Sequence, residues 1–185
     1  SESLAARATD GMTQRPLYIL APYVPSAPDV VERMLNLAEI GPTDLVYDIG
    51  CGDGRLAIAA ARRGARAVGI DLETYWVEQA RAAAKEAGVD ARVEFHAGDA
   101  LQHDLRAATV LLMYLVDWSV AMISVAARAQ CQAGTRLISN SFAFPDSDAI
   151  TQRFIDANGQ LRQIHRWDVP RDPYRTGGNG RSDDG

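Results

Sequence analysis

The sequence predicts an α/β fold in which helices cover both faces of a mostly parallel sheet. Two observations predict it: short β-prone runs alternate with helical segments, and a glycine-rich turn joins the first such run to a helix. Because this alternating order leads to right-handed crossovers, most strands are expected to lie parallel. With 185 residues, the chain has the length of one compact domain.

We expect a flexible N-terminal segment over 1–20, a single domain over 21–170 and a flexible tail over 171–185. The first residues carry few large apolar side chains, and residues 176–185 are rich in glycine and aspartate. No internal repeat occurs at the periods typical of solenoids. The middle of the chain must therefore form one core.

Composition and charge exclude several classes of protein. Hydrophobic residues make up 47% and charged residues 23%, which is typical of a globular protein and not of a disordered chain. The formal net charge is −5 and Lys85 is the only lysine, so no basic stripe is present and we expect no nucleic-acid partner. Apolar runs such as 109–116 are too short for a transmembrane segment. Cys51 and Cys131 are too few for a disulfide framework and, without a signal-peptide pattern, favour a cytoplasmic location.

The first predicted element is a helix that ends near Ala38. Ser26, followed by Asp29 three residues later, resembles an N-cap for this helix. Residues 41–44 break the chain after it, and the β-prone run over 45–49 begins the sheet.

Helices and strands alternate from there on. An alanine-rich helix over 55–63 is closed by Gly64, and a longer helix over 74–87 is closed by Gly88. The last β-prone run, 161–169, has the alternation of an edge strand that could be antiparallel. The remaining elements are strands at 67–70, 93–96, 109–116 and 135–139 and a helix at 119–129.

A glycine-rich turn follows the first predicted strand. Gly50, Gly52 and Gly54 form a G-x-G-x-G pattern, whereas a dinucleotide site needs G-x-G-x-x-G. Arg55 occupies the position of the third glycine, where its side chain would crowd the helix, and no Gly-Lys-Ser/Thr follows for a phosphate loop. Asp48 places a carboxylate beside the turn, which favours a ligand with an ammonium group over one with phosphates. A tight turn without any ligand is the alternative.

At these residues the sequence resembles the class I S-adenosylmethionine-dependent methyltransferases, whose first motif has the form (V/L)-x-D-x-G-C-G-x-G. Asp48, Gly50, Gly52 and Gly54 match that motif. Over about residues 20–145 the chain is similar to one subgroup, the mitochondrial lysine methyltransferases of the adenine nucleotide translocase and the ATP synthase c subunit, with their bacterial relatives. The stretches that carry this likeness are 22–26, 46–56, 107–115 and 134–139.

The resemblance implies a Rossmann-like, seven-stranded sheet. The chain could truncate this sheet, because little sequence follows the fifth predicted strand. The resemblance also implies that Asp48 and the backbone of residues 50–54, including Cys51, surround the methionyl end of the cofactor. Chemistry agrees, since the ammonium group of that end attracts a carboxylate.

The ribose and adenine contacts follow from the same resemblance. It places Asp71, with Leu72 beside it, at the ribose hydroxyls, whose two donors a carboxylate can accept. It places Asp99, between Gly98 and Ala100, at the adenine amino group. The alternatives are a helix-capping carboxylate for Asp71 and a local Asx-turn for Asp99.

The segment 22–26 corresponds to the family's N-terminal cover. The resemblance implies that Tyr23 and Ser26 contact the cofactor, and the two prolines of this segment would stiffen a lid. The alternative is a linker into the first helix.

The expected catalytic residues, Tyr114 and Asp117, follow the fourth predicted strand, where methyltransferases meet their acceptor. Tyr114 is also expected to contact the cofactor. The Asp/Asn-Pro-Pro-Tyr signature is absent there, which disfavours DNA adenine and glutamine acceptors. Asp117 and Asn140 could hold a magnesium ion, but no third carboxylate stands at the right place, so no metal site is expected.

The expected activity is methyl transfer from S-adenosylmethionine to a nucleophile, with S-adenosylhomocysteine as product and a protein lysine amine as the expected acceptor. The alternatives are a small-molecule acceptor and a non-catalytic domain that binds S-adenosylmethionine or S-adenosylhomocysteine. A nicotinamide dehydrogenase is a third alternative, which Arg55 opposes. No oligomeric state is predicted.

Overall fold

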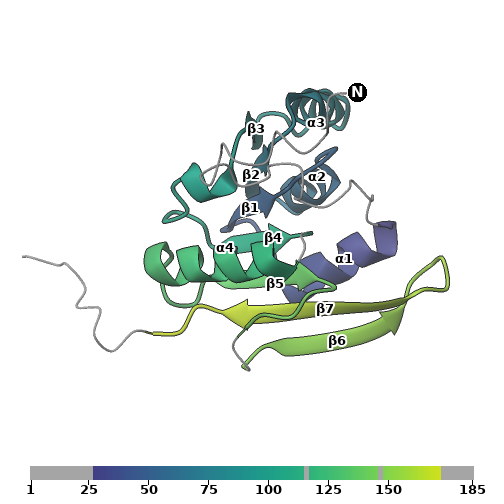
Figure 1. Cartoon of the computed structure of the whole chain (residues 1–185). Coiled ribbons are helices and arrows are strands. Elements are labelled where there is room, and N and C mark those ends of the chain that lie inside the picture. Colours follow the sequence, from purple (N-terminus) through teal and green to yellow (C-terminus); the bar gives the residue numbers. More distant parts are fainter. Residues whose placement is uncertain (1–26, 115–116, 146–147, 172–185) are drawn as a thin grey trace, which may run out of the picture.

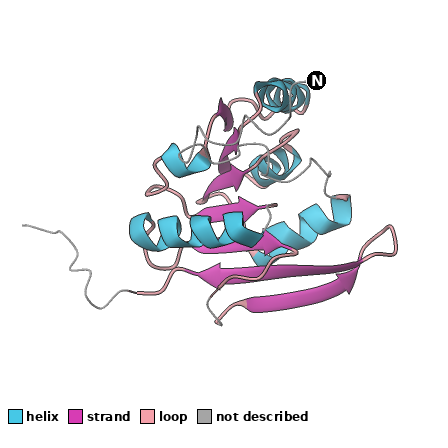
Figure 2. Cartoon of the chain, viewed as in Figure 1, coloured by secondary structure: helices cyan, strands magenta, loops and turns pink. Residues whose placement is uncertain are grey.

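The computed structural model describes residues 27–114, 117–145 and 148–171. These residues form a single sheet with helices on both faces (Figures 1 and 2). In chain order its elements are α1 (Pro28–Leu37), β1 (Leu45–Ile49), α2 (Arg55–Arg62), β2 (Arg66–Asp71), α3 (Thr74–Glu86), β3 (Val93–Ala97), the 3₁₀-helix η2 (Ala100–Gln102), β4 (Val110–Met113), α4 (Asp117–Gln130), β5 (Arg136–Asn140), β6 (Ile150–Ile155) and β7 (Leu161–Asp168).

The seven strands follow the order β3-β2-β1-β4-β5-β7-β6. Strands β1 to β5 pair in parallel, β7 lies antiparallel to β5, and β6 lies antiparallel to β7. The expected mostly parallel, seven-stranded sheet is therefore confirmed, and none of its strands is missing. The order reverses at β1, so the loops after β1 and β4 diverge from a switch point at the carboxyl edge of the sheet.

The C-terminal part of the sheet differs from the prediction in two ways. The edge strand β6 was not predicted, because five of its six residues are exposed and no period-2 alternation marks them. The described residues between β5 and β6 also form no helix. The truncation that the short C-terminal sequence suggested therefore affects a helix and not a strand. The antiparallel placement of the run 161–169 is confirmed, but its expected place at the edge is wrong, because β7 lies between β5 and β6.

The start of the first helix also differs. Ser26 was predicted as the N-cap, but the cap is Ala27, which makes no side-chain capping bond. Pro28 occupies the first helical position, where its missing N–H would have no partner in any case, so the proline starts the helix without a polar cap.

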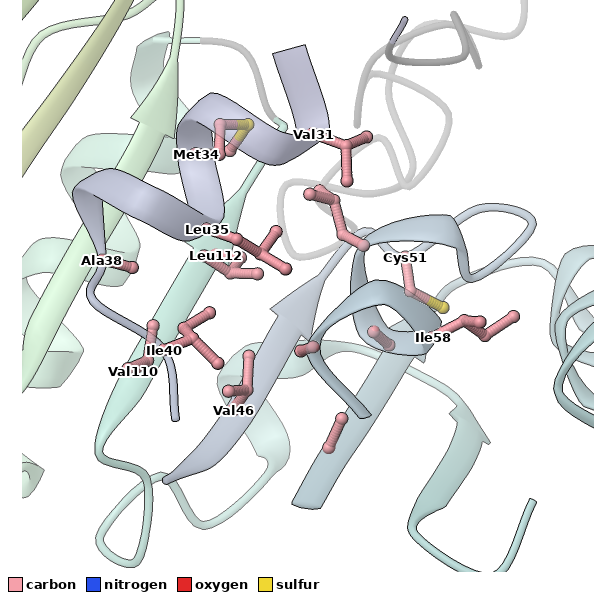
Figure 3. Packing of buried hydrophobic residues seen from close by; sticks show 14 of the residues in the cluster. Val31, Met34, Leu35, Ala38, Ile40, Val46, Cys51, Ile58, Val110 and Leu112 are labelled. Atoms are coloured by element: carbon pink, nitrogen blue, oxygen red, sulfur yellow. The ribbon is translucent and has the colours of Figure 1, made fainter. Parts of the chain in front are cut away.

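Helices α1, α2 and α3 cover one face of the sheet. Figure 3 shows Met34 and Leu35 of α1 in one cluster with Leu112 of β4. The alanines of α2 explain its close approach to the sheet, since Ala57 and Ala60 are completely buried. The helix thus packs by its backbone more than by long side chains.

Helix α4 covers the opposite face, where Val120 and Ile123 pack against Met113 and Leu137. At the far end of α4, the guanidinium of Arg128 lies 5.1 Å from the centre of the Trp167 ring of β7. None of the helices in the described ranges is both long and apolar enough to cross a membrane.

A buried ion pair lies at the amino edge of the sheet. Arg136 of β5 donates to Asp44, and the same carboxylate accepts hydrogen bonds from the Thr109 hydroxyl at 2.8 Å and the Gly41 N–H at 2.9 Å. The Thr109 hydroxyl in turn accepts from the Leu45 N–H at 2.9 Å. This network joins the turn before β1 to the starts of β4 and β5.

Arg136→Ala is expected to lower the free energy of unfolding by about 3 kcal/mol, because it leaves the buried Asp44 carboxylate without its cation. Chemical denaturation at pH 7 measures this change. Arg106→Ala is the matched control, since Arg106 pairs with Asp104 on the exposed surface and its loss should not measurably change stability. Equal effects of the two substitutions would contradict a structural role for the buried pair.

Candidate active site

The glycine-rich turn lies at the switch point and is fixed by β2. The N–H groups of Gly50 and Cys51 both donate to the Ile70 carbonyl, at 2.8 and 3.0 Å. Gly50 and Gly52 have φ values of 73° and 53°, in the left-handed region that glycine enters at little cost. The turn therefore has a defined shape at the carboxyl edge of the sheet, where backbone hydrogen bonds hold it against the end of β2.

Gly54 is the position where helix and strand pack closely. A Cβ there would lie 2.8 Å from Phe95 Cζ and 2.9 Å from Ala80 Cβ. The expectation that Arg55 crowds this packing is wrong, because Arg55 opens α2 with its side chain 39% exposed and pairs with Asp53 at 2.6 Å. The third glycine of G-x-G-x-G, one position earlier than in a dinucleotide site, does the packing.

Asp48 is a buried carboxylate without a counter-charge. It is 1% exposed, and neither of its oxygens has a hydrogen-bond partner among the described residues. Burial raises the pKa of Asp48 to about 7, the charges of Asp71 and Asp53 add to the rise, and the backbone N–H of Ala57 works against it. Such a group would be stabilised in its ionised form by a ligand that carries a positive charge.

The Cys51 side chain lacks the surroundings that activate a nucleophilic thiol. Burial is the main cause that raises the pKa of its thiol, with the neighbouring Asp48 carboxylate adding to it. The thiol thus stays protonated at neutral pH, and a protonated thiol is a poor nucleophile. Cys51 contributes to the turn through its backbone.

Asp71, at the end of β2, orients the glycine-rich turn. One of its oxygens accepts the Gly52 N–H and the other the Glu73 N–H, both at 2.9 Å. The N-cap of α3 is Glu73, so Asp71 is not the capping residue of that helix. Each of its carboxylate oxygens keeps a further lone pair for a hydroxyl donor. Leu72 beside it is half-buried.

The loop after β3 lies next to Asp71. The Gly98 N–H donates to the Asp71 carbonyl at 2.8 Å, with a Gly98 φ of 148°. The Asp99 carboxylate accepts the Leu101 N–H at 2.9 Å and caps η2, whose first residue is the buried Ala100. The local turn considered for Asp99 is thus present, and the loop is anchored to the backbone carbonyl of Asp71.

Tyr114 follows β4 at the same edge, and it has a partner that was not predicted. The Arg162 guanidinium of β7 interacts with the Tyr114 hydroxyl, which helps to raise the pKa of Arg162. Asp156 is the main cause of that rise and holds Arg162 Nε at 2.7 Å. No sequence signal pointed to Arg162, because only the antiparallel return of β7 along β5 brings it near Tyr114.

Three predicted site residues cannot be placed. Tyr23 and Ser26, and with them the proposed cover, lie outside the described residues. Asp117 is the first residue of α4, but its side chain is outside them as well. The predicted terminal segments 1–20 and 171–185 also fall outside, except for Arg171.

Comparison with known proteins identifies the family to which this chain belongs. The family described as the ANTKMT methyltransferase domain matches residues 48–151, which include the glycine-rich turn and the ends of β2 and β4. The chain belongs to this family. It is an S-adenosylmethionine-dependent methyltransferase, as the resemblance of its first motif implied.

The methyltransferase is similar to lysine-specific enzymes along most of its described length. A protein-lysine N-methyltransferase of Saccharolobus islandicus is 36% identical over 123 residues, which are 65% of this chain and 76% of that protein. The adenine nucleotide translocase lysine N-methyltransferase of mouse is 32% identical over 136 residues, 73% of this chain. The aligned region spans only 59% of the mouse protein, so this chain matches little more than half of that relative's length.

The methyltransferase also has a solved structural relative. An RNA methyltransferase from Salinibacter ruber, in complex with S-adenosylhomocysteine, has a TM-score of 0.74 and 38% identity. The similarity covers 83% of this chain and 98% of that one. Together with the family match, this relative supports S-adenosylmethionine as the cofactor.

Proposed function

We propose that this methyltransferase transfers a methyl group to the amine of a protein lysine. The observation that carries the acceptor class is the relationship to the archaeal protein-lysine N-methyltransferase, of which the chain matches three quarters. The enzyme itself has a single lysine, Lys85, so it offers little target for self-methylation. Cys51 and Cys131 form no disulfide, in keeping with a reducing compartment such as the cytoplasm.

The residues at the switch point fit S-adenosylmethionine. We assign its ammonium group to Asp48, because no side chain among the described residues pairs with this buried carboxylate. The backbone of residues 50–54 would border the methionyl chain, and Asp71 would accept the ribose hydroxyls. Leu72 is assigned to the cofactor beside Asp71, the adenine contacts to Gly98, Asp99 and Ala100, and the cover to Tyr23 and Ser26.

The protein's part in the reaction is to bind, orient and exclude water. S-adenosylmethionine supplies an activated methyl group when bound, so alignment of the acceptor provides most of the acceleration. We assign this alignment to Tyr114, whose oxygen accepts from Arg162, since a guanidinium can only donate. A lysine acceptor must lose its proton before transfer, because its ammonium form has no lone pair for the methyl group. Asp117 is the second proposed catalytic residue and could receive that proton.

Tyr114→Phe is expected to lower kcat about 10-fold to 100-fold and to leave the Kd of S-adenosylhomocysteine within about twofold, because it removes one hydroxyl contact to the acceptor. Steady-state kinetics and calorimetric titration measure the two effects. Tyr75→Phe, on an exposed face of α3, is the control and should change neither. An unchanged kcat in Tyr114→Phe would remove this residue from the mechanism.

RNA is the second candidate acceptor, because the solved relative from Salinibacter ruber is described as an RNA methyltransferase. The net charge of −5 opposes it, since RNA binding relies on basic surface. The enzyme is therefore incubated with methyl-tritiated S-adenosylmethionine and separated protein and RNA fractions of one cell extract. Label recovered as methyllysine after acid hydrolysis of the protein supports the proposal. Label in the RNA fraction alone would replace lysine by RNA.

If neither fraction takes up label while S-adenosylhomocysteine still binds, the lysine proposal fails. A small-molecule acceptor or a non-catalytic binding domain then accounts for the chain. A small-molecule acceptor would show as label in the low-molecular-weight fraction of the same extract, which separates these two readings.

A further inference from the structure

Asn140, the last residue of β5, carries a buried polar atom that the fold does not use. The residue is 2% exposed, and its Oδ1 has no hydrogen-bond partner among the described residues. Leaving a buried acceptor unpaired destabilises a fold. A side chain of this kind at the carboxyl edge of the sheet indicates a group that is satisfied only when a ligand is present.

The strand register places Asn140 beside the proposed acceptor site. Met113 pairs with Ser139, so Tyr114, which directly follows β4, and Asn140, the last residue of β5, come next in the register. Adjacent strands lie about 4.8 Å apart. Asn140 is thus a direct neighbour of the residue to which we assign acceptor alignment.

Asn140 also faces the same side of the sheet as the cofactor carboxylate. Val46, Leu112 and Ile138 all belong to the core cluster under α1. Because side chains alternate along a strand, the residues two positions further on point to that same side. These residues are Asp48, Tyr114 and Asn140.

We propose that Asn140 Oδ1 accepts a hydrogen bond from an N–H of the acceptor amine and so orients its nitrogen toward the methyl group. This inference rests on the proposed function, methyl transfer to an amine, and names Asn140 as the residue that selects an amine acceptor. An amide oxygen suits this role because it binds an N–H without a formal negative charge. A carboxylate in its place would favour the ammonium form, which has no lone pair for the methyl group.

Ligands that need no identified acceptor protein test this inference. Two analogues of S-adenosylhomocysteine carry a nitrogen in place of the sulfur, and this nitrogen bears either a 3-aminopropyl arm or a butyl arm of the same length. Calorimetry gives the Kd of each analogue, and of S-adenosylhomocysteine itself, for the wild type and for Asn140→Ala. Asn140→Leu is a second, nearly isosteric variant in case the smaller side chain impairs folding, and Asn36→Ala on the exposed face of α1 is the control.

The wild type and the control are expected to bind the aminopropyl analogue about tenfold more tightly than the butyl analogue. This ratio of Kd values corresponds to the free energy of one hydrogen bond to an amine. Both Asn140 variants should lose this preference to within about twofold and keep the wild-type Kd for S-adenosylhomocysteine. A variant that keeps the preference, or that loses S-adenosylhomocysteine binding, would overturn the assignment of Asn140. A wild type without any preference would instead overturn the amine acceptor itself.

Discussion

Asp48→Asn is expected to be more stable than the wild type at pH 8 and to bind S-adenosylmethionine about 30-fold more weakly, the effect of losing one charge-assisted hydrogen bond. Burial raises the pKa of Asp48 from 3.8 to about 7, so the folded protein binds more protons than the unfolded chain between these values. The contribution of Asp48 to stability is therefore lost as the pH rises from about 4 to 7, by about 4 kcal/mol in total. Asparagine cannot ionise, so the variant escapes this loss.

Thermal and chemical unfolding at several pH values between 4 and 9 measures the first effect, and calorimetric titration the second. The free energy of unfolding of the variant minus that of the wild type should grow with pH up to about 7 and then level off. We expect a final difference of about 2 kcal/mol, because the unpaired hydrogen-bonding groups of the new buried amide offset part of the gain. Asp90→Asn, in an exposed turn, is the control and should change neither quantity. A variant that binds S-adenosylmethionine as tightly as the wild type would remove Asp48 from the cofactor site.

Gly69→Ala is expected to destabilise the fold by about 3 kcal/mol, because β2 has no room for a side chain at this position. A Cβ on Gly69 would lie 2.4 Å from Phe95 Cδ1 and 3.0 Å from Cys51 Cβ. The Phe95 ring thus fills the space over Gly69 and under Gly54, and it locks β2, β3 and the start of α2 together. Chemical denaturation measures the loss.

Gly41→Ala is the matched control, since nothing lies within 4 Å of a Cβ at that position. Its effect should stay within about 0.5 kcal/mol. Adding Phe95→Val to Gly69→Ala should cost less than the sum of the two single changes, because the smaller side chain removes the clash. Additive effects would show that the glycine acts by some means other than contact with Phe95.

The regular α/β part of the fold could be predicted because its signals are local. The alanine-rich run that forms α2 and the β-prone run that forms β1 each show their structure within a few residues, and Gly50 to Gly54 mark the turn between them. Strand β6 could not be found in the same way. It is an exposed edge strand whose partner, β7, alone determines its pairing.

The candidate site could be predicted in part for the same reason. Asp48, Asp71 and Asp99 each end a strand or begin the loop after it, so sequence position already places them at the carboxyl edge. The contacts of Arg162 and the unpaired oxygen of Asn140 depend on β7 returning antiparallel beside β5 and on burial. No spacing in the sequence encodes these two features. The prediction that Arg55 crowds the helix was wrong because the close packing occurs at Gly54, one position earlier.

The central claim is that Asp48 receives the ammonium group of the cofactor. The number of protons taken up or released during S-adenosylhomocysteine binding tests this claim most directly. Calorimetric titrations at pH 7 in two buffers with different ionisation enthalpies give the number of protons exchanged. Since the pKa of Asp48 is about 7, about half of its population carries a proton before binding, and a bound ammonium group lowers that pKa. We predict release of about half a proton by the wild type and none by Asp48→Asn. Tight binding by the wild type without proton release would contradict this account of the site.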